Sequence, residues 1–312
     1  MAEIQLSPEP ETKAEPSKDT TASIMHSPTF SERVSALGDP FYILALGIYC
    51  FFSVLWNALF VEKNYKSLAD VKDKAFSKLW NDHLCQPSAQ QYLSCLTGSA
   101  SLPPPVLAKA TGVVLDIGPG NGTQVKYFTN PAVEQIYGIE PCVPLHDQLR
   151  KQAAASPVAD KYHIVEASAE PRSLYKQLRK HGLLPKGSTT AVFDTICTVR
   201  CLCSVPDPDK VIAGLYPLLK PGGKFLVVEH VINPWTAPTG SILARLVQII
   251  CQNLGFPFFV GNCHLNRDTS RIIDMAAIGD GGWESVELET LFGYSPFAHI
   301  SASFTKRHSE KK

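Results

Sequence analysis

The amino-acid sequence predicts an α/β protein. Its centre is a doubly wound, mostly parallel seven-stranded sheet with an antiparallel last strand, and a hydrophobic helix precedes the sheet. From about residue 110 onwards, apolar strand-like segments alternate with helical segments, which is typical of a parallel sheet covered on both faces. The last two strand-like segments are joined by LFGYSPF, which is too short for a crossover helix and so favours a hairpin.

The N-terminal part is predicted to divide into two segments. Residues 1–38 are expected to form a disordered polar lead, because Pro, Glu, Ser, Thr and Lys dominate it and leave little apolar surface to offset the entropy of ordering. Residues 39–62 are predicted to form a transmembrane helix, since 41–61 lack charge and can cross a hydrocarbon layer of about 30 Å. Ser53 and Asn57 dilute the run, so the alternative is a helix buried against the following domain.

Lysines gather after this segment, which favours a single-pass protein with its main domain in the cytosol, at the endoplasmic reticulum or a similar membrane. Residues 63–312 are predicted to form that domain. A helical pattern covers about 66–105, including SAQQYLSCL, until SLPPPV breaks it. The expected strands are 112–118, 135–141, 162–168, 191–198, 223–231, 283–290 and 298–306. The expected helices are 143–155, 171–181, 207–219, 241–253 and 267–277.

The stretch 242–261 is apolar but is interrupted by polar side chains, among them Arg245 and Gln248. It is therefore interpreted as an amphipathic helix that either lines a substrate pocket or lies on a bilayer.

Charge and cysteine usage exclude some functions. Lys plus Arg equals Asp plus Glu, 29 against 29, so we expect no nucleic-acid partner. The nine cysteines include no CxxC pair, and the densest group is Cys197, Cys201 and Cys203. We interpret these cysteines as apolar packing in a reducing compartment and expect no metal site. The sequence carries no signal for an oligomeric state.

The segment VVLDIGPGNGTQVKYF, residues 113–128, carries the clearest functional motif. A strand ends at Asp116, and the loop Gly118, Pro119, Gly120, Asn121 and Gly122 follows. Such a loop lies at the carboxyl end of a parallel strand, where ligands of these sheets bind. Its spacing, G-x-G-x-G, is one residue shorter than the dinucleotide motif G-x-G-x-x-G.

Asp116 favours one ligand over the other. A carboxylate that faces the ligand repels a pyrophosphate, at a cost of about 1 to 4 kcal/mol at ~4 Å. It suits S-adenosylmethionine, which carries an ammonium and a sulfonium and no phosphate. We therefore predict an S-adenosylmethionine site.

Other strand ends supply the remaining expected contacts. Glu140, followed by Pro141, ends the second strand and can accept the ribose hydroxyls of either ligand. Ala169 and Glu170 follow the third strand and are expected at the adenine amine. Thr198 is expected at the edge of the fourth strand, beneath the methyl donor.

With these residues, the chain from about 110 to 305 resembles class I S-adenosylmethionine-dependent methyltransferases. More narrowly, it resembles the methyltransferase-like 7 family, membrane-anchored enzymes that methylate alkyl thiols. The narrower resemblance is carried by FDTICTVRCLCSVPDPDKVI, LLKPGGKFLVVEHV, GNCHLNRDTSR and the preceding hydrophobic segment. The chain departs from that family in its polar lead, in PRSLYKQLRKHGLLPKGSTT and at Arg200, which leaves the acceptor open.

The resemblance implies methyl transfer to a thiol of a small apolar molecule at a lipid bilayer, with a hydroxyl as the second choice. The alternatives are an oxygen or nitrogen of a natural product or lipid, and a non-catalytic membrane-tethered interaction protein. A thiol with a pKa near 8.5 needs little help to ionise, whereas a hydroxyl needs a base. The candidate catalytic residues are His230, after the fifth strand, and His264, beside Cys263.

Overall fold

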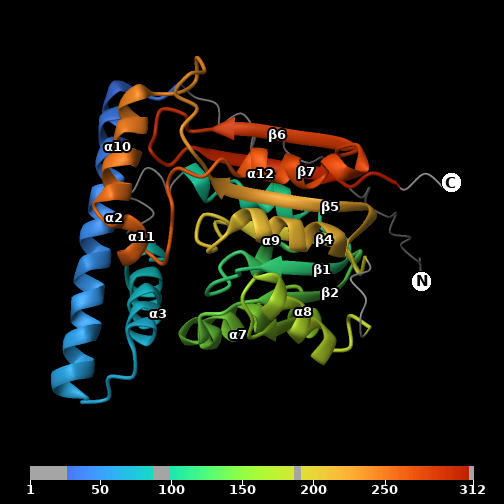
Figure 1. Ribbon diagram of the computed structural model, residues 1–312, viewed down its shortest axis with the longest axis horizontal. Helices are drawn as coiled ribbons and strands as arrows, with labels where there is room; N and C mark the ends of the chain where they lie inside the picture. Colours follow the sequence, from blue (N-terminus) through green and yellow to red (C-terminus); the bar gives the residue numbers. More distant parts are fainter. Residues whose placement is uncertain (1–26, 87–97, 186–190, 309–312) are drawn as a thin grey trace, which may run out of the picture.

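A seven-stranded sheet forms the centre of the computed structural model, which describes residues 27–86, 98–185 and 191–308 (Figure 1). Its strand order is β3-β2-β1-β4-β5-β7-β6. β7 pairs antiparallel with β5 and β6, and the other described pairs are parallel, so the predicted fold class is confirmed. The strands are β1 (Gly112–Ile117), β2 (Val133–Ile139), β3 (Tyr162–Val165), β4 (Phe193–Val199), β5 (Leu219–His230), β6 (Ser285–Leu291) and β7 (His299–Thr305).

Helices cover both faces of the sheet, as continuous apolar strands require. One face packs against α8 (Pro171–Lys180), α9 (Pro208–Leu215) and α12 (Thr269–Ala276). The other packs against α6 (Pro103–Leu107) and α7 (His146–Ala154). The five helices predicted from residue 143 onwards are all present, within a few residues of their expected bounds.

The region predicted as helical over 66–105 contains α3 (Leu68–Lys78), the π-helical turn η2 (Leu79–Leu84) and α6. The run SLPPPV was expected to break a helix, but its prolines instead form the first turn of α6, where a missing N–H costs nothing. The segment SAQQYLSCL lies outside the described residues.

The N-terminal helix α2 (Phe30–Trp56) begins before residue 39, inside the segment expected to be a disordered lead. A capping box causes this early start: the Thr29 hydroxyl accepts from the Glu32 amide at 3.2 Å, and the Glu32 carboxylate accepts from the Thr29 amide at 2.7 Å. With the π-helical turn η1 (Asn57–Val61), α2 forms one helix long and apolar enough to cross a membrane.

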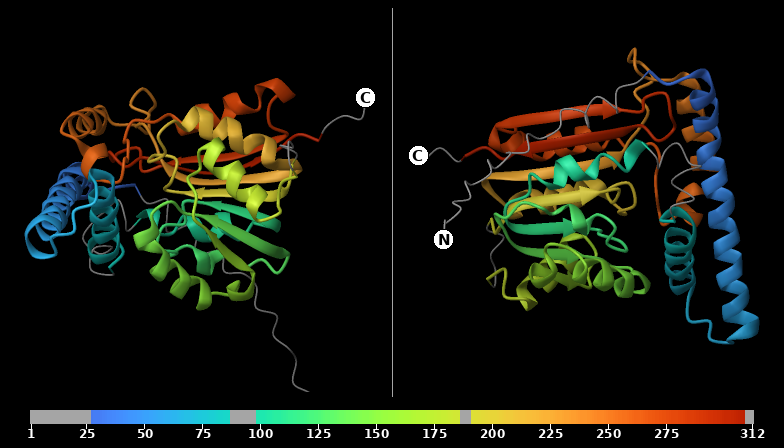
Figure 2. Two further views of the ribbon diagram at one scale, coloured as in Figure 1. Left: turned by 60° about the horizontal axis from the view of Figure 1, so that its bottom comes forward. Right: turned by 180° about the vertical axis from the view of Figure 1, so that it is seen from behind.

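α2 also packs onto the domain. It lies beside α3, α10 (Ile242–Asn253) and α11 (Phe256–Phe259), and this helical wall stands at the carboxyl ends of the parallel strands (Figures 1 and 2). The approach is close at Gly47, where a Cβ atom would lie 2.8 Å from the Phe259 carbonyl oxygen. One side of α2 is therefore buried, as the alternative interpretation expected, while Tyr42, Phe52 and Trp56 are exposed.

Candidate active site

A cavity of about 610 Å³ lies between the carboxyl ends of the strands and the helical wall. We call its two parts the glycine-loop end and the histidine end. The glycine-loop end is lined by Gly118, Pro119, Gly120, Glu140, Pro141, Cys142, Ala169 and Glu170. The histidine end is lined by Phe76, Cys203, His230, Phe256, Val260, Cys263, Phe297 and His299.

Glu140 holds the glycine loop in place. Its carboxylate accepts hydrogen bonds from the Gly120 and Cys142 backbone amides, both at 2.8 Å. Burial raises the pKa of Glu140, and these two amides oppose the rise. Each carboxylate oxygen keeps a lone pair after accepting one bond, so Glu140 has free acceptor capacity at the cavity, and its contact with ribose hydroxyls stays a prediction.

The loop conformation requires glycine. Gly118 has φ +66°, and a Cβ atom there would overlap the Cys201 sulfur. The loop residue Asn121 ties the loop to the π-helical turn η2. Its side-chain oxygen accepts from the Trp80 indole at 3.3 Å, and its side-chain amide donates to Asn81 at 2.9 Å. Asn121 and Gly122 thus shape the loop without lining the cavity.

The structure corrects the expected position of Asp116, which does not line the cavity and does not face a ligand there. The Tyr162 hydroxyl donates to one of its oxygens at 2.7 Å, and the Cys197 thiol donates to the other at 3.5 Å. Burial raises the pKa of Asp116 to about 6. Side chains alternate along a strand, so Ile117 faces the cavity while the Asp116 carboxyl group points to the opposite side of β1.

Ala169 and Glu170 lie on the cavity wall, where an adenine contact was predicted. Thr198 does not: its hydroxyl is buried away from the cavity and finds no partner among the described residues. Strand alternation again explains the correction, because Val199, the next residue of β4, lines the cavity instead. Arg200 also lines it, but it follows the strand end with φ +54° and is outside the alternation.

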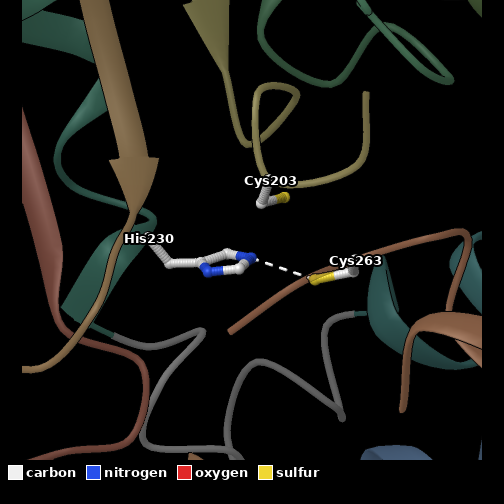
Figure 3. Close-up of side chains that lie close together, drawn as sticks. All are labelled: Cys203, His230 and Cys263. Carbon is white, nitrogen blue, oxygen red and sulfur yellow. Dashed lines mark hydrogen bonds between the residues drawn. The ribbon is translucent and has the colours of Figure 1, made fainter. Parts of the chain in front are cut away.

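His230 and His264 have different environments. His230 ends β5 opposite His299 of β7, and its Nε2 lies 3.0 Å from the Cys263 sulfur (Figure 3). His264 does not line the cavity, and its ring forms a hydrogen bond with the Gln252 side chain at 2.6 Å. Of the two predicted catalytic candidates, only His230 is therefore placed to meet a substrate in this cavity.

Two cysteines beside His230 were not predicted as site residues. The Cys203 and Cys263 sulfurs and a ring nitrogen of His230 all lie within 4.8 Å of one another. The pKa of Cys203 is lowered well below its usual value, because the Cys263 thiol and the His230 ring stabilise its thiolate against the cost of burial. Burial alone would lower the pKa of His230, but the Cys203 thiolate and, after it, Glu229 together raise it above its usual value.

The group Cys197, Cys201 and Cys203, weighed as a metal site from sequence, does not act together. Cys197 bonds Asp116, whereas Cys203 meets His230 and Cys263 from other parts of the chain. The nearest sequence signal was that Cys263 adjoins His264 in GNCHLNRDTSR.

Comparisons with known proteins agree with this architecture. A family model described as a methyltransferase domain matches residues 90–250. The thiol S-methyltransferase TMT1B of Rattus norvegicus is 27% identical over 119 residues, which are 38% of this chain and 46% of that protein. The match thus spans about half the length of that relative.

The first of two similar solved structures shows the same fold. An O-methyltransferase family protein from Burkholderia thailandensis superposes with a TM-score of 0.52 at 16% identity, over 86% of this chain and 73% of that chain. The N-methyltransferase NodS from Bradyrhizobium japonicum WM9, in complex with S-adenosyl-L-homocysteine, gives 0.48 at 12% identity, over 74% and 98%.

Proposed function

The chain belongs to the methyltransferase-domain family, and from that premise we propose that it methylates a thiol of a small apolar molecule at a membrane. The cosubstrate is S-adenosylmethionine, which supplies a methyl group already activated on a sulfonium sulfur. The residues of this chain then have to bind both reactants, align them and exclude water.

The glycine-loop end fits the cosubstrate. Gly118 and Gly120 bring the backbone close to a ligand, Glu140 offers carboxylate oxygens to the ribose, and Ala169 and Glu170 lie on the same wall for the adenine. No charge contact from Asp116 is part of this proposal, since its carboxyl group is buried against Tyr162 and does not line the cavity.

The histidine end fits an apolar thiol, and this is the observation that carries the proposal. Phe76, Phe256 and Phe297 give it apolar walls, and Cys203, His230 and Cys263 supply polar groups suited to sulfur. We place His230 as the catalytic residue that meets the acceptor. The carboxylates on the described wall are Asp73, Glu140 and Glu170. Glu140 and Glu170 belong to the other end, and Asp73 lies beside it, since its backbone carbonyl accepts from the Cys142 thiol at 3.6 Å. A hydroxyl, which needs a strong base, is therefore the second choice.

Turnover of the full chain with labelled donor tests this. An alkyl thiol, a phenol, an alcohol and an amine of similar size should be compared, and label should enter the thiol fastest. His230→Gln should lower thiol turnover about 100-fold or more, the usual range for loss of a group that helps to ionise the nucleophile, while His264→Gln serves as the matched control. Faster labelling of an oxygen or nitrogen acceptor would replace the thiol assignment, and no turnover with any acceptor would favour a non-catalytic tethered protein.

The membrane setting rests on the outer sides of α2 and α10. These neighbouring helices each expose large apolar side chains, including Phe52 and Trp56 on α2 and Ile242, Leu243 and Leu246 on α10. Because α2 also forms part of the cavity wall, we propose that this face lies on the bilayer while the domain remains in the cytosol. The single-pass crossing predicted from sequence is the competing arrangement.

Flotation with liposomes separates these arrangements. Phe52→Glu and Leu246→Glu together should abolish binding, whereas Val286→Glu, at an exposed apolar site on β6, should not. Resistance of the wild type to alkaline carbonate extraction would instead support a crossing helix, and unchanged flotation of the double variant would contradict the proposed face.

A further inference from the structure

Cys203, His230 and Cys263 lie close together (Figure 3), and we propose that they form a zinc site whose fourth coordination position opens into the cavity. Two thiolates and one imidazole are a ligand set that selects zinc among the abundant divalent ions. The three residues come from three separate parts of the chain, so no sequence spacing reveals them as one site.

The distances suit a metal ion. A tetrahedral zinc ion with bonds of about 2.3 Å to sulfur and about 2.0 Å to nitrogen separates its ligand atoms by about 3.5 to 3.8 Å. Here the three ligand atoms lie within 4.8 Å of one another, and His230 Nε2 and the Cys263 sulfur are 3.0 Å apart. Side-chain shifts of about 1 Å therefore suffice to reach ideal geometry.

The two loops that carry the cysteines are tied together by hydrogen bonds. The His264 amide donates to the Cys203 carbonyl at 2.9 Å. The Asn262 side chain donates to the Ser204 carbonyl at 2.7 Å. Each of these bonds joins a residue next to one cysteine with the other cysteine or its neighbour. The protein thus holds both sulfurs near His230 without help from the metal, as a preorganised site requires.

The site has an open position. All three side chains line the cavity, and three protein ligands with a free fourth position are the pattern of catalytic rather than structural zinc. Two thiolates neutralise the charge of Zn²⁺, so the buried site carries no net charge until an anionic ligand arrives. An apolar thiol that enters along the aromatic wall meets the metal with its sulfur.

The role in catalysis rests on the proposed thiol acceptor. Binding of the acceptor sulfur to zinc releases the thiol proton to solvent, since a coordinated thiol is deprotonated outright. The thiolate sulfur then attacks the methyl carbon: a new sulfur–carbon bond forms, and the bond from that carbon to the sulfonium breaks. Its electron pair stays on the departing sulfur, which becomes a neutral thioether. The methylated acceptor is a neutral thioether too, so it binds zinc weakly and leaves.

Metal analysis of the full chain, purified under reducing conditions without chelators, tests the site. We expect about one zinc ion per chain in the wild type and less than about 0.1 in Cys203→Ser, Cys263→Ser and His230→Gln. Cys251→Ser is the matched control, because Cys251 is buried in the same apolar cluster as Cys203 and Cys263 but lies outside the site, and this variant should keep its zinc. Calorimetry with S-adenosylhomocysteine checks that each variant folds.

Cobalt replacement adds a readout that does not depend on turnover. The Co²⁺-substituted wild type should show the intense visible bands of a tetrahedral thiolate complex, and an apolar alkyl thiol should shift them. Wild-type protein that binds neither metal, while still binding S-adenosylhomocysteine, would overturn the site. So would a Cys203–Cys263 disulfide as the only modification, with no metal bound after reduction. If the wild type retains zinc but the bands of the Co²⁺ protein respond to no thiol, the result would support the metal site and overturn its role with the acceptor.

Discussion

The glycine-loop end and the histidine end belong to one cavity but are built in different ways. The glycine-loop end uses short segments at the ends of β1, β2 and β3, where each residue's place follows from its position after a strand. The histidine end joins Cys203, His230 and Cys263 with side chains of the N-terminal helices. The first is encoded locally and holds a cosubstrate shared by many enzymes, whereas the second depends on how distant segments pack and sets the acceptor.

The largest effect should come from Glu140→Ala. It removes two hydrogen bonds to a charged group, each worth about 1.5 to 3 kcal/mol, and frees the glycine loop. The affinity for S-adenosylmethionine should fall by about 100-fold or more, while thiol binding at the histidine end persists. Calorimetry measures both, and Glu140→Gln, which keeps one acceptor oxygen, should lose less. An unchanged cosubstrate affinity in Glu140→Ala would contradict the assignment of the cosubstrate to the glycine-loop end.

Asp116→Asn should change the pH dependence of stability. The folded-state pKa of Asp116, about 6, exceeds its ordinary value of 3.8, so the fold prefers the protonated carboxyl group. Its contribution is fully present below pH 3.8 and is lost as the pH rises through 6, about 3 kcal/mol in total. The free energy of unfolding of the variant, measured in urea between pH 4 and 7, should lack this decline. A decline as steep as that of the wild type would assign it to other groups.

A moderate effect confined to the histidine end is expected from Gly47→Val. The added side chain collides with the Phe259 carbonyl and pushes α2 away from α11, a kind of overpacking that costs about 1 to 3 kcal/mol. The kcat/KM for the acceptor should fall about tenfold, with cosubstrate affinity within about twofold of wild type. Gly38→Val is the control on the same helix, since a Cβ atom there meets nothing within 4 Å. An equal loss of acceptor kcat/KM and of cosubstrate affinity would show that the packing of α2 stabilises the whole domain.

The smallest effect should follow from His264→Ala. Its ring bonds Gln252 and does not line the cavity, so turnover should stay within about threefold of wild type. Stability should fall by about 1 kcal/mol for the lost hydrogen bond. Steady-state kinetics and thermal unfolding check this, and a turnover loss as large as that of His230→Gln would return His264 to the list of catalytic residues.

The fold was predictable because alternating apolar strands and helices leave few ways to cover a sheet, and the hairpin of β6 and β7 followed from a short connection. Gly118, Gly120 and Glu140 were predictable for the same local reason. Asp116 and Thr198 were misplaced because sequence does not tell which side of a strand end faces the ligand. Cys203 and Cys263 were missed because their meeting depends on tertiary packing. Phe76 was missed because the helical pattern over 66–105 does not show which side of that helix meets the cavity.

The central claim is that one cavity brings a cosubstrate on the glycine loop and an acceptor sulfur beside His230 together. An experimental structure of the full chain with S-adenosylhomocysteine and an alkyl thiol tests it most directly. We predict that the ribose lies on Glu140, and that the thiol sulfur lies between the cosubstrate sulfur and the group Cys203, His230 and Cys263. A thiol bound outside this cavity, or a nucleotide held away from Glu140, would contradict the account.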